Sequence, residues 1–283
     1  QLSNFTAGEL SPRLDGRNDL AKYSAGCATV ENMVIYPHGA AARRPGTTFI
    51  AEVKSSAAKT RLISFEFSTT QTYIIELGNQ YMRFYRDNGQ ILSSGSPFEI
   101  STPYLTDELF DIKFAQSADV MYITHPSHPV KKLSRTGHTS WTLVTCNFTN
   151  GPYLDTNTST TTITASAQTV GTGRTFTASA STFASTDVDR LIRFRDGHAK
   201  VTGFTSATVV TVEILVDTGS ASASTDWSLG AFSDTTGHPS CVSFFEQRLA
   251  FAATLSQPQT VFFSKSGDYE NMDANIGGTV ADD

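Results

Sequence analysis

Three segments of the chain repeat the same order of short apolar strands. The first strands are ISF at 63–65, IKF at 112–114 and VSF at 242–244. About ten residues later each is followed by a second apolar strand, YII at 73–75, YI at 122–123 and FA at 251–252. A tight-turn glycine then closes each unit about 25 residues after its first strand: Gly89, Gly137 and Gly267. Period-two runs rich in Ile, Phe, Tyr and Val predict an all-β protein.

The spacing of the repeats predicts a partial β-propeller. The first strands lie 49 and 130 residues apart, and removing the Thr-, Ser- and Ala-rich stretch from about 151 to 232 restores a period near 48. A period of 40 to 50 residues with three or four strands is typical of propeller blades, although any all-β protein shows loose strand spacing. Three blades leave two open edges, so we expect a longer polypeptide that supplies the missing blades.

Four segments follow from these patterns: an N-terminal arm at 1–50, blades at 51–150, an inserted β-domain at 151–232 and a further blade at 233–283. Alternating runs in the insert predict a small closed barrel or sandwich. These runs are TTIT at 161–164, TFT at 175–177, LIRF at 191–194, AKVT at 199–202 and VVTVEILV at 209–216. Arg195-Asp196-Gly197 between two of them predicts a hairpin turn.

The arm differs from the rest of the chain in its periodicity. Apolar residues recur there at steps of three and four, with Asn18 as an N-cap and Pro37 and Gly39 at the end, which predicts one helix. The positions are Leu20, Tyr23, Cys27, Val30 and Val34. After the helix, Arg43 and Arg44 adjoin Pro45, and we expect an arm that packs on another surface.

Charge and cysteine content exclude several functions. The 283 residues carry 21 basic and 27 acidic side chains, a net charge of -6, which argues against a domain that holds nucleic acid by neutralising phosphates. No apolar stretch approaches the roughly 18 residues that span a bilayer, so we expect no stable membrane insertion. Cys27, Cys146 and Cys241 are odd in number and far apart, and we expect free, mostly buried thiols.

A search for catalytic motifs finds none. The chain has no phosphate-binding loop, HExxH, GxSxG or complete GxGxxG, and we predict that it is not an enzyme and uses no cofactor. Paired carboxylates of the glycosidase kind need no local motif and stay open.

We also predict no metal site. His125 and His128 have a suggestive spacing, but Pro126 and Pro129 forbid the helix that would bring both rings to one side, and no carboxylate lies close in sequence. The acidic group Asp268, Glu270 and Asp273 lacks the spacing of a calcium-binding EF-hand.

Several longer segments resemble one family. They are NFTAGELSPR at 4–13, GRNDLAKY at 16–23, ENM at 31–33, RRPGT at 43–47, DVDRLIRF at 187–194, WSLG at 227–230, GHPS at 237–240, FEQRLAF at 245–251, PQTV at 258–261 and SKSGDY at 264–269. Together they resemble the tail nozzle, or tail tubular protein B, of short-tailed bacteriophages. The stretch 155–186 matches nothing in that family.

The resemblance implies a structural protein of the virion tail, assembled in the cytoplasm of the bacterial host. Family members build on a propeller and form a hexameric ring below the portal and the adaptor, or head-to-tail connector. They carry tail fibres or spikes, and DNA passes through the channel without specific binding. We expect Arg17, Arg43 and Arg44 of the arm to contact a neighbouring subunit or the adaptor.

Two alternatives stay open. A carbohydrate-binding or glycan-cleaving receptor module would expose aromatic side chains such as Trp227 or Tyr153 along a groove. A plug that closes the tail until ejection would differ from an open nozzle in whether loops block the channel.

Overall fold

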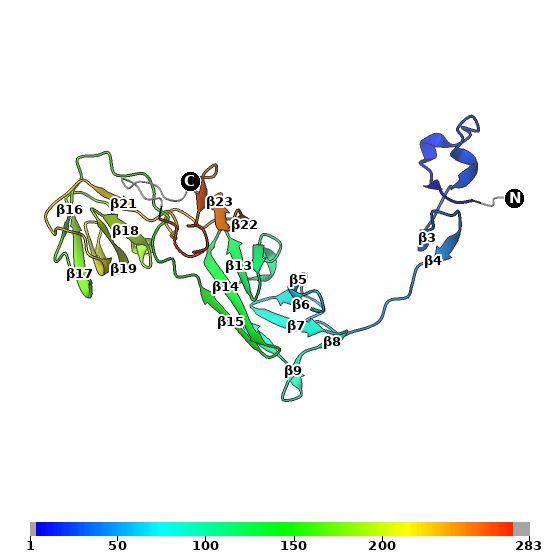
Figure 1. Cartoon of the computed structure of the whole chain (residues 1–283), viewed down its shortest axis with the longest axis horizontal. Helices are drawn as coiled ribbons and strands as arrows, with labels where there is room; N and C mark the ends of the chain where they lie inside the picture. Colours follow the sequence, from blue (N-terminus) through cyan, green and yellow to red (C-terminus); the bar gives the residue numbers. More distant parts are fainter. Residues whose placement is uncertain (1–3, 274–283) are drawn as a thin grey trace. The chain divides into compact units, whose positions relative to one another are not determined.

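A computed structural model describes residues 4–273 of the chain, so residues 274–283 of the last predicted blade lie outside it. The chain divides into two compact units, residues 1–50 and 51–283 (Figure 1). Strands dominate the larger unit, and the helices of the described part are single 3-10 turns: η1 (Pro12–Leu14), η2 (Tyr23–Ala25), η3 (Thr106–Glu108) and η4 (Ser185–Asp187). The all-β prediction is confirmed. No helix in the described range is long and apolar enough to cross a membrane.

The N-terminal unit consists of short strand pairs. Strand β1 (Gly8–Glu9) pairs in parallel with β2 (Gly26–Cys27), and β3 (Met33–Ile35) pairs with β4 (Ala41–Arg43) in an antiparallel hairpin. Among residues 4–50 the only buried residue is Gly39. The unit therefore has no hydrophobic core among its described residues.

The helix predicted for the arm is wrong. Cys27 lies in a strand, where its carbonyl accepts the Leu10 N–H at 2.9 Å, and the Val30 N–H donates to the Glu9 carboxylate at 2.8 Å. Asn32 has a φ of 55°, which no α-helix accepts. The three- and four-residue spacing of apolar side chains is not matched by a buried stripe, and without burial an isolated helix of this length gains little stability.

Besides the sheet of the insert, the described part of the larger unit contains three antiparallel sheets, and the first strand of each contains all or most of one of the three repeated segments. The strand positions predicted from the repeat are confirmed. The first sheet holds β5 (Arg61–Ser68), β6 (Gln71–Gly78), β7 (Tyr81–Arg86), β8 (Gly89–Gln90) and β11 (Glu99–Ser101). The second holds β12 (Lys113–Ser117), β13 (Val120–His125), β14 (His128–Gly137) and β15 (Ser140–Thr145). The third holds β22 (Cys241–Phe245), β23 (Arg248–Ala252) and β24 (Val261–Phe263). A small hairpin, β9 (Leu92–Ser93) with β10 (Ser96–Pro97), leaves the first sheet.

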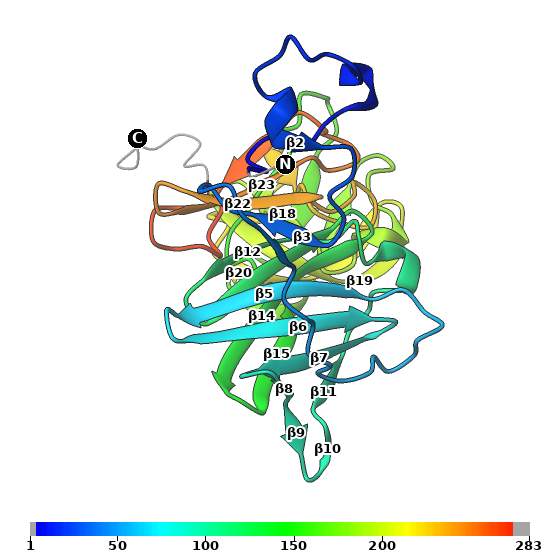
Figure 2. The ribbon, with the colours of Figure 1, turned by 90° about the vertical axis from the view of Figure 1, so that its right-hand side faces the viewer.

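Consecutive sheets share hydrophobic cores. Phe65, Ile75 and Phe84 of the first sheet pack with Leu133 and Trp141 of the second. A separate cluster joins the second sheet to the third, with Tyr122 and Val130 against Leu249 and Phe251. Figure 2 shows the first sheet in cyan lying across the green strands of the second. Face-to-face burial of this kind holds the three sheets in chain order.

The insert forms one six-stranded sheet in the order β16-β17-β20-β19-β18-β21. The strands are β16 (Ile163–Ala165), β17 (Gly171–Ala178), β18 (Leu191–Phe194), β19 (Gly197–Ser206), β20 (Val209–Val216) and β21 (Trp227–Leu229). It has its own core around Phe176, Phe194 and Ile214. Ile163 of β16 bridges Ser224, just before β21, so the sheet curls toward itself as a half-barrel.

Candidate functional site

Two histidines of the second sheet face one another across a tight turn. Strand β13 ends at His125 and β14 begins at His128, and the two residues are a cross-strand pair. Pro126 and Ser127 therefore form the loop. Side chains of a directly opposed pair project from the same face of the sheet with their Cβ atoms about 5 Å apart. As the two prolines predicted, no helix forms here. The expectation that the His125 and His128 rings could not lie on one side was wrong, because the β13–β14 hairpin places both on the same face of the sheet.

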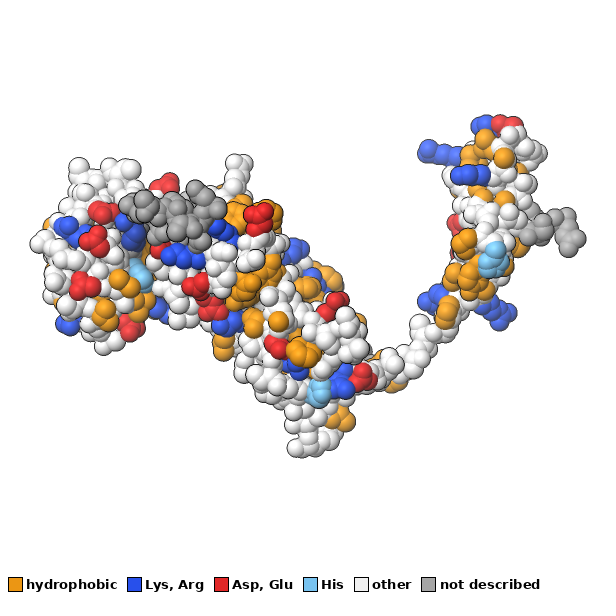
Figure 3. All heavy atoms as spheres, in the orientation of Figure 1, with side chains coloured by type: hydrophobic (Ala, Val, Ile, Leu, Met, Phe, Trp, Pro, Cys, Tyr) orange, Lys and Arg blue, Asp and Glu red, His pale blue; other side chains and the backbone are white. Residues whose placement is uncertain are grey.

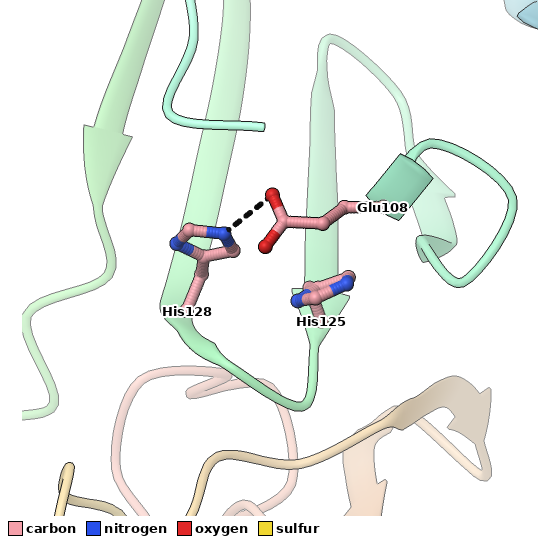
Figure 4. Close-up of side chains that lie close together, drawn as sticks. All are labelled: Glu108, His125 and His128. Carbon is pink, nitrogen blue, oxygen red and sulfur yellow. Dashed lines mark hydrogen bonds and ion pairs between the residues drawn. The ribbon is translucent and has the colours of Figure 1, made fainter. Parts of the chain in front are cut away.

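A carboxylate from another segment joins the two rings. Glu108 ends the 3-10 turn η3, and its Oε2 accepts the Leu105 N–H at 2.8 Å, which fixes the start of that turn. The same oxygen lies 2.9 Å from Nε2 of His128. One potential ligand atom from each of Glu108, His125 and His128 lies within 4.8 Å of the others (Figure 4). We call these three residues the Glu-His-His cluster.

The cluster is walled on one side by a tyrosine. Tyr104 is fully buried, and its ring centroid lies 5.3 Å from that of His128 and 6.2 Å from that of His125. His125 is only 3% exposed. Its Nδ1 accepts the Ser127 N–H at 3.2 Å. Within the described residues, Nε2 of His125 and the Tyr104 hydroxyl are buried without a hydrogen-bond partner.

Burial and neighbouring groups together shift the pKa values of His125 and Glu108. It lowers the pKa of His125, and the Glu108 carboxylate opposes that shift while His128 adds to it. Burial alone would raise the pKa of Glu108, but the Leu105 N–H and His128 outweigh it, and the pKa of Glu108 is lowered. A neutral imidazole beside a carboxylate is the protonation state that binds divalent metals.

Sequence reasoning missed Glu108. It lies 17 residues before His125, on a turn that leads from the first sheet to the second, and no spacing rule connects it to a hairpin. The signal that could have found the pair was the dipeptide between the histidines, since two residues flanked by strands predict a hairpin.

The three arginines predicted for assembly lie in the N-terminal unit. Arg17 forms an exposed ion pair with Asp19, with 2.6 Å between Nη2 and Oδ2. Arg43 ends β4, and the Arg44 N–H donates to the Asn32 carbonyl at 2.9 Å. Both side chains are exposed, and among the described residues neither guanidinium has an ion-pair partner. No described contact joins Arg17 to the other two.

The other residues singled out from the sequence have structural partners. Glu270 pairs with Lys132, and Asp273 lies 3.3 Å from Nζ of Lys265. All three cysteines are free, but only Cys146 is buried, so the expectation of mostly buried thiols is wrong; burial raises the pKa of Cys146 to about 12.

The two aromatic residues considered for sugar stacking do not offer an open ring face. Trp227 is 9% exposed, packs in the insert core, and donates its Nε1–H to the Thr161 carbonyl at 3.0 Å. Tyr153 is half-buried and donates its hydroxyl to Asn150 Oδ1 at 2.7 Å. A pocket does lie next to Tyr153, and its lining mixes apolar side chains such as Phe148 with polar ones such as Lys200 and Asp234.

Neither known protein-family models nor curated proteins give a match to this chain.

Proposed function

We propose that the chain is a subunit of the tail nozzle of a short-tailed bacteriophage. In this proposal six copies form a ring below the portal and adaptor in the virion tail, carry fibres or spikes, and conduct DNA without binding it specifically. Assembly takes place in the cytoplasm of the bacterial host. The observation that carries the proposal is the N-terminal unit, whose described residues expose apolar and arginine side chains and bury only Gly39.

The N-terminal unit lacks the burial that stabilises small domains. A chain of about 50 residues is marginal even with a core, and here no apolar side chain among residues 4–50 is buried. Met33, Val34, Tyr36 and Phe49 are all exposed. Figure 3 shows hydrophobic side chains at the surface of this unit, with Lys and Arg side chains beside them. Contact with a neighbouring subunit or the adaptor would bury these side chains.

Arg43 and Arg44 would supply the charged interactions of this contact with a neighbouring subunit or the adaptor. Two adjacent guanidinium groups without ion-pair partners in the described structure match carboxylates on a partner, which they can bind in bidentate fashion. Replacing both with Glu would turn that attraction into repulsion.

The topology and packing of the three sheets favour a propeller, as the proposal requires. Each is an antiparallel meander that starts at a repeated strand, and neighbouring sheets bury apolar faces against one another. Blades of a propeller pack in this way. The net charge of -6 is compatible with a channel wall that repels phosphates.

The test is negative-stain imaging with native mass spectrometry of the full-length protein, alone and mixed with its portal and adaptor. We expect a six-fold ring with an axial channel. The variant Arg43→Glu/Arg44→Glu should fail to assemble, while Arg13→Glu/Lys22→Glu, which reverses two exposed charges of the same unit, should assemble normally.

Two results would count against the proposal. A monomer that ignores portal and adaptor but binds a surface polysaccharide would favour the receptor module. Normal assembly of Arg43→Glu/Arg44→Glu would exclude these arginines from the contact.

A further inference from the structure

We propose that the Glu-His-His cluster binds a zinc ion through the Glu108 carboxylate and Nε2 of His125 and His128. Two imidazole nitrogens and one carboxylate are a ligand set that zinc accepts, with a fourth position for water. Zinc binding at this cluster would require no role of the chain in a tail.

The unpartnered nitrogen of His125 is the first argument. Buried polar side-chain atoms nearly always have a hydrogen-bond partner, and one without a partner needs an explanation. Nε2 of His125 has no partner among the described residues, and a ring nitrogen of His125 lies within 4.8 Å of a carboxylate oxygen and of a second imidazole nitrogen. A cation among the three groups would give that nitrogen its missing partner.

The distances are the second argument. Ligand atoms of a tetrahedral zinc site lie about 3.3 Å apart, since each bond is about 2.0–2.1 Å long. The ligand atoms of the cluster already lie within 4.8 Å of one another, and the Glu108–His128 pair is 2.9 Å apart. The ligand atoms would therefore need to approach one another by at most about 1.5 Å to reach the spacing of a zinc site.

Metal binding replaces two hydrogen bonds. The Nε2 proton that His128 shares with Glu108 moves to Nδ1 of the same ring, which frees Nε2 to bind the ion. In His125 the ring proton likewise moves to Nδ1, and the contact at 3.2 Å from the Ser127 N–H is lost. Zinc thus gains two neutral imidazole ligands and one carboxylate. Starting from two neutral imidazoles and an ionised Glu108, the ring protons only change nitrogen, and no proton is released.

A bound zinc ion would link two segments of the larger unit that are separate in sequence. Glu108 lies on the link from the first sheet to the second, while the histidines lie at the β13–β14 turn. Because the ion binds the folded arrangement and not the unfolded chain, its binding free energy adds to stability.

The test uses the untagged full chain, freed of metal with a chelator, equilibrated with Zn²⁺ and passed through a desalting column. We expect one zinc per chain by elemental analysis, and a rise in Tm on adding Zn²⁺. Co²⁺ in place of Zn²⁺ should give the visible absorption of a four-coordinate site.

Three variants locate the site. Loss of an outer-shell partner commonly costs 10–100-fold in metal affinity, so His125→Gln and His128→Gln should each cost about 100-fold or more. Glu108→Gln keeps an oxygen for the Leu105 N–H and so preserves the turn, yet it should also weaken binding and abolish the Zn²⁺-dependent rise in Tm. His38→Gln, at an exposed histidine of the N-terminal unit, should bind zinc as the wild type does.

The outcomes are decisive in both directions. Circular dichroism of Glu108→Gln separates lost ligation from lost folding. A wild-type chain that retains no zinc, or cluster variants that bind it as tightly as His38→Gln, would overturn the proposal.

Discussion

Asp187 and Arg190 form an ion pair in which both side chains are only 2% exposed, with 2.7 Å between Oδ1 and Nη1. Arg190 also donates its Nε–H to the Gly230 carbonyl at 2.7 Å, and Asp187 accepts hydrogen bonds from the Ala184 N–H and the Thr235 hydroxyl. The pair therefore ties η4 of the insert to the segment that leaves it.

Removing one member of this pair should be costly. Asp187→Ala leaves the Arg190 charge buried, where burial already lowers the pKa of the guanidinium, and we expect a loss of about 3–5 kcal/mol in the free energy of unfolding. Urea denaturation followed by tryptophan fluorescence measures it. The matched control is Asp226→Ala, whose carboxylate is 54% exposed and pairs with Arg193; its cost should stay within about 1 kcal/mol. Equal losses in the two variants would contradict the argument.

Trp141 should contribute most to the contact between the first and second sheets. The centroid of its ring lies 4.3 Å from that of Phe84, with the two rings stacked, and 4.8 Å from that of Phe65, with the rings edge-on. Trp141→Ala should cost about 3–5 kcal/mol in the free energy of unfolding, because the space it leaves is enclosed by two sheets. Chemical denaturation followed by circular dichroism measures the loss. Val144→Ala, on the same strand but at a side chain that is 47% exposed, should change stability by about 0.5 kcal/mol or less.

The strands were predictable because burial on one face leaves a period of two in the sequence. LIRF at 191–194 and VVTVEILV at 209–216 coincide with β18 and β20, and the turn at Arg195-Asp196 joins Phe194 to Gly197 as a hairpin. The arm was not predictable in this way. None of its apolar side chains is buried within the described part of its own unit, so their spacing does not reflect a core-facing stripe.

The Glu-His-His cluster could be predicted from the sequence only in part. The histidines could be picked out by their spacing, but their partner Glu108 is placed by the packing of a separate turn, and only the folded chain brings the three together. Local patterns describe strands and hairpins; clusters that join distant segments depend on tertiary contacts.

Gly197 should tolerate no side chain, although its φ is not unusual. A Cβ there would lie 2.3 Å from the Val216 carbonyl oxygen and 2.5 Å from that of Asp217, and backbone atoms of a sheet cannot move aside cheaply. We expect Gly197→Ala to cost about 1–3 kcal/mol or more, measured by urea denaturation. Gly203→Ala, on the same strand, would meet its nearest atom, Cβ of Thr211, at 3.6 Å, which is ordinary contact. A loss for Gly203→Ala as large as for Gly197→Ala would contradict this explanation.

His198 should make the larger unit less stable in acid. The ring is buried, and its Nε2–H donates to the Thr149 carbonyl at 2.9 Å. Burial lowers the pKa of His198, while the Thr149 carbonyl and the Asp273 carboxylate oppose the shift. Because the unfolded chain takes up this proton more readily than the folded one, stability is full above the unfolded pKa of about 6.5 and falls as the pH drops below it.

The slope from one such histidine is at most about 1.4 kcal/mol per pH unit. Urea midpoints between pH 7.5 and pH 5.5 measure it. His198→Gln keeps a donor for the Thr149 carbonyl but cannot titrate, so its midpoint should fall less steeply with acidification than that of the wild type. Part of the slope should remain, because burial also lowers the pKa of His125 and His238. His38→Gln, at an exposed ring, should follow the wild-type curve, and a His198→Gln curve parallel to it would assign the acid sensitivity to other groups.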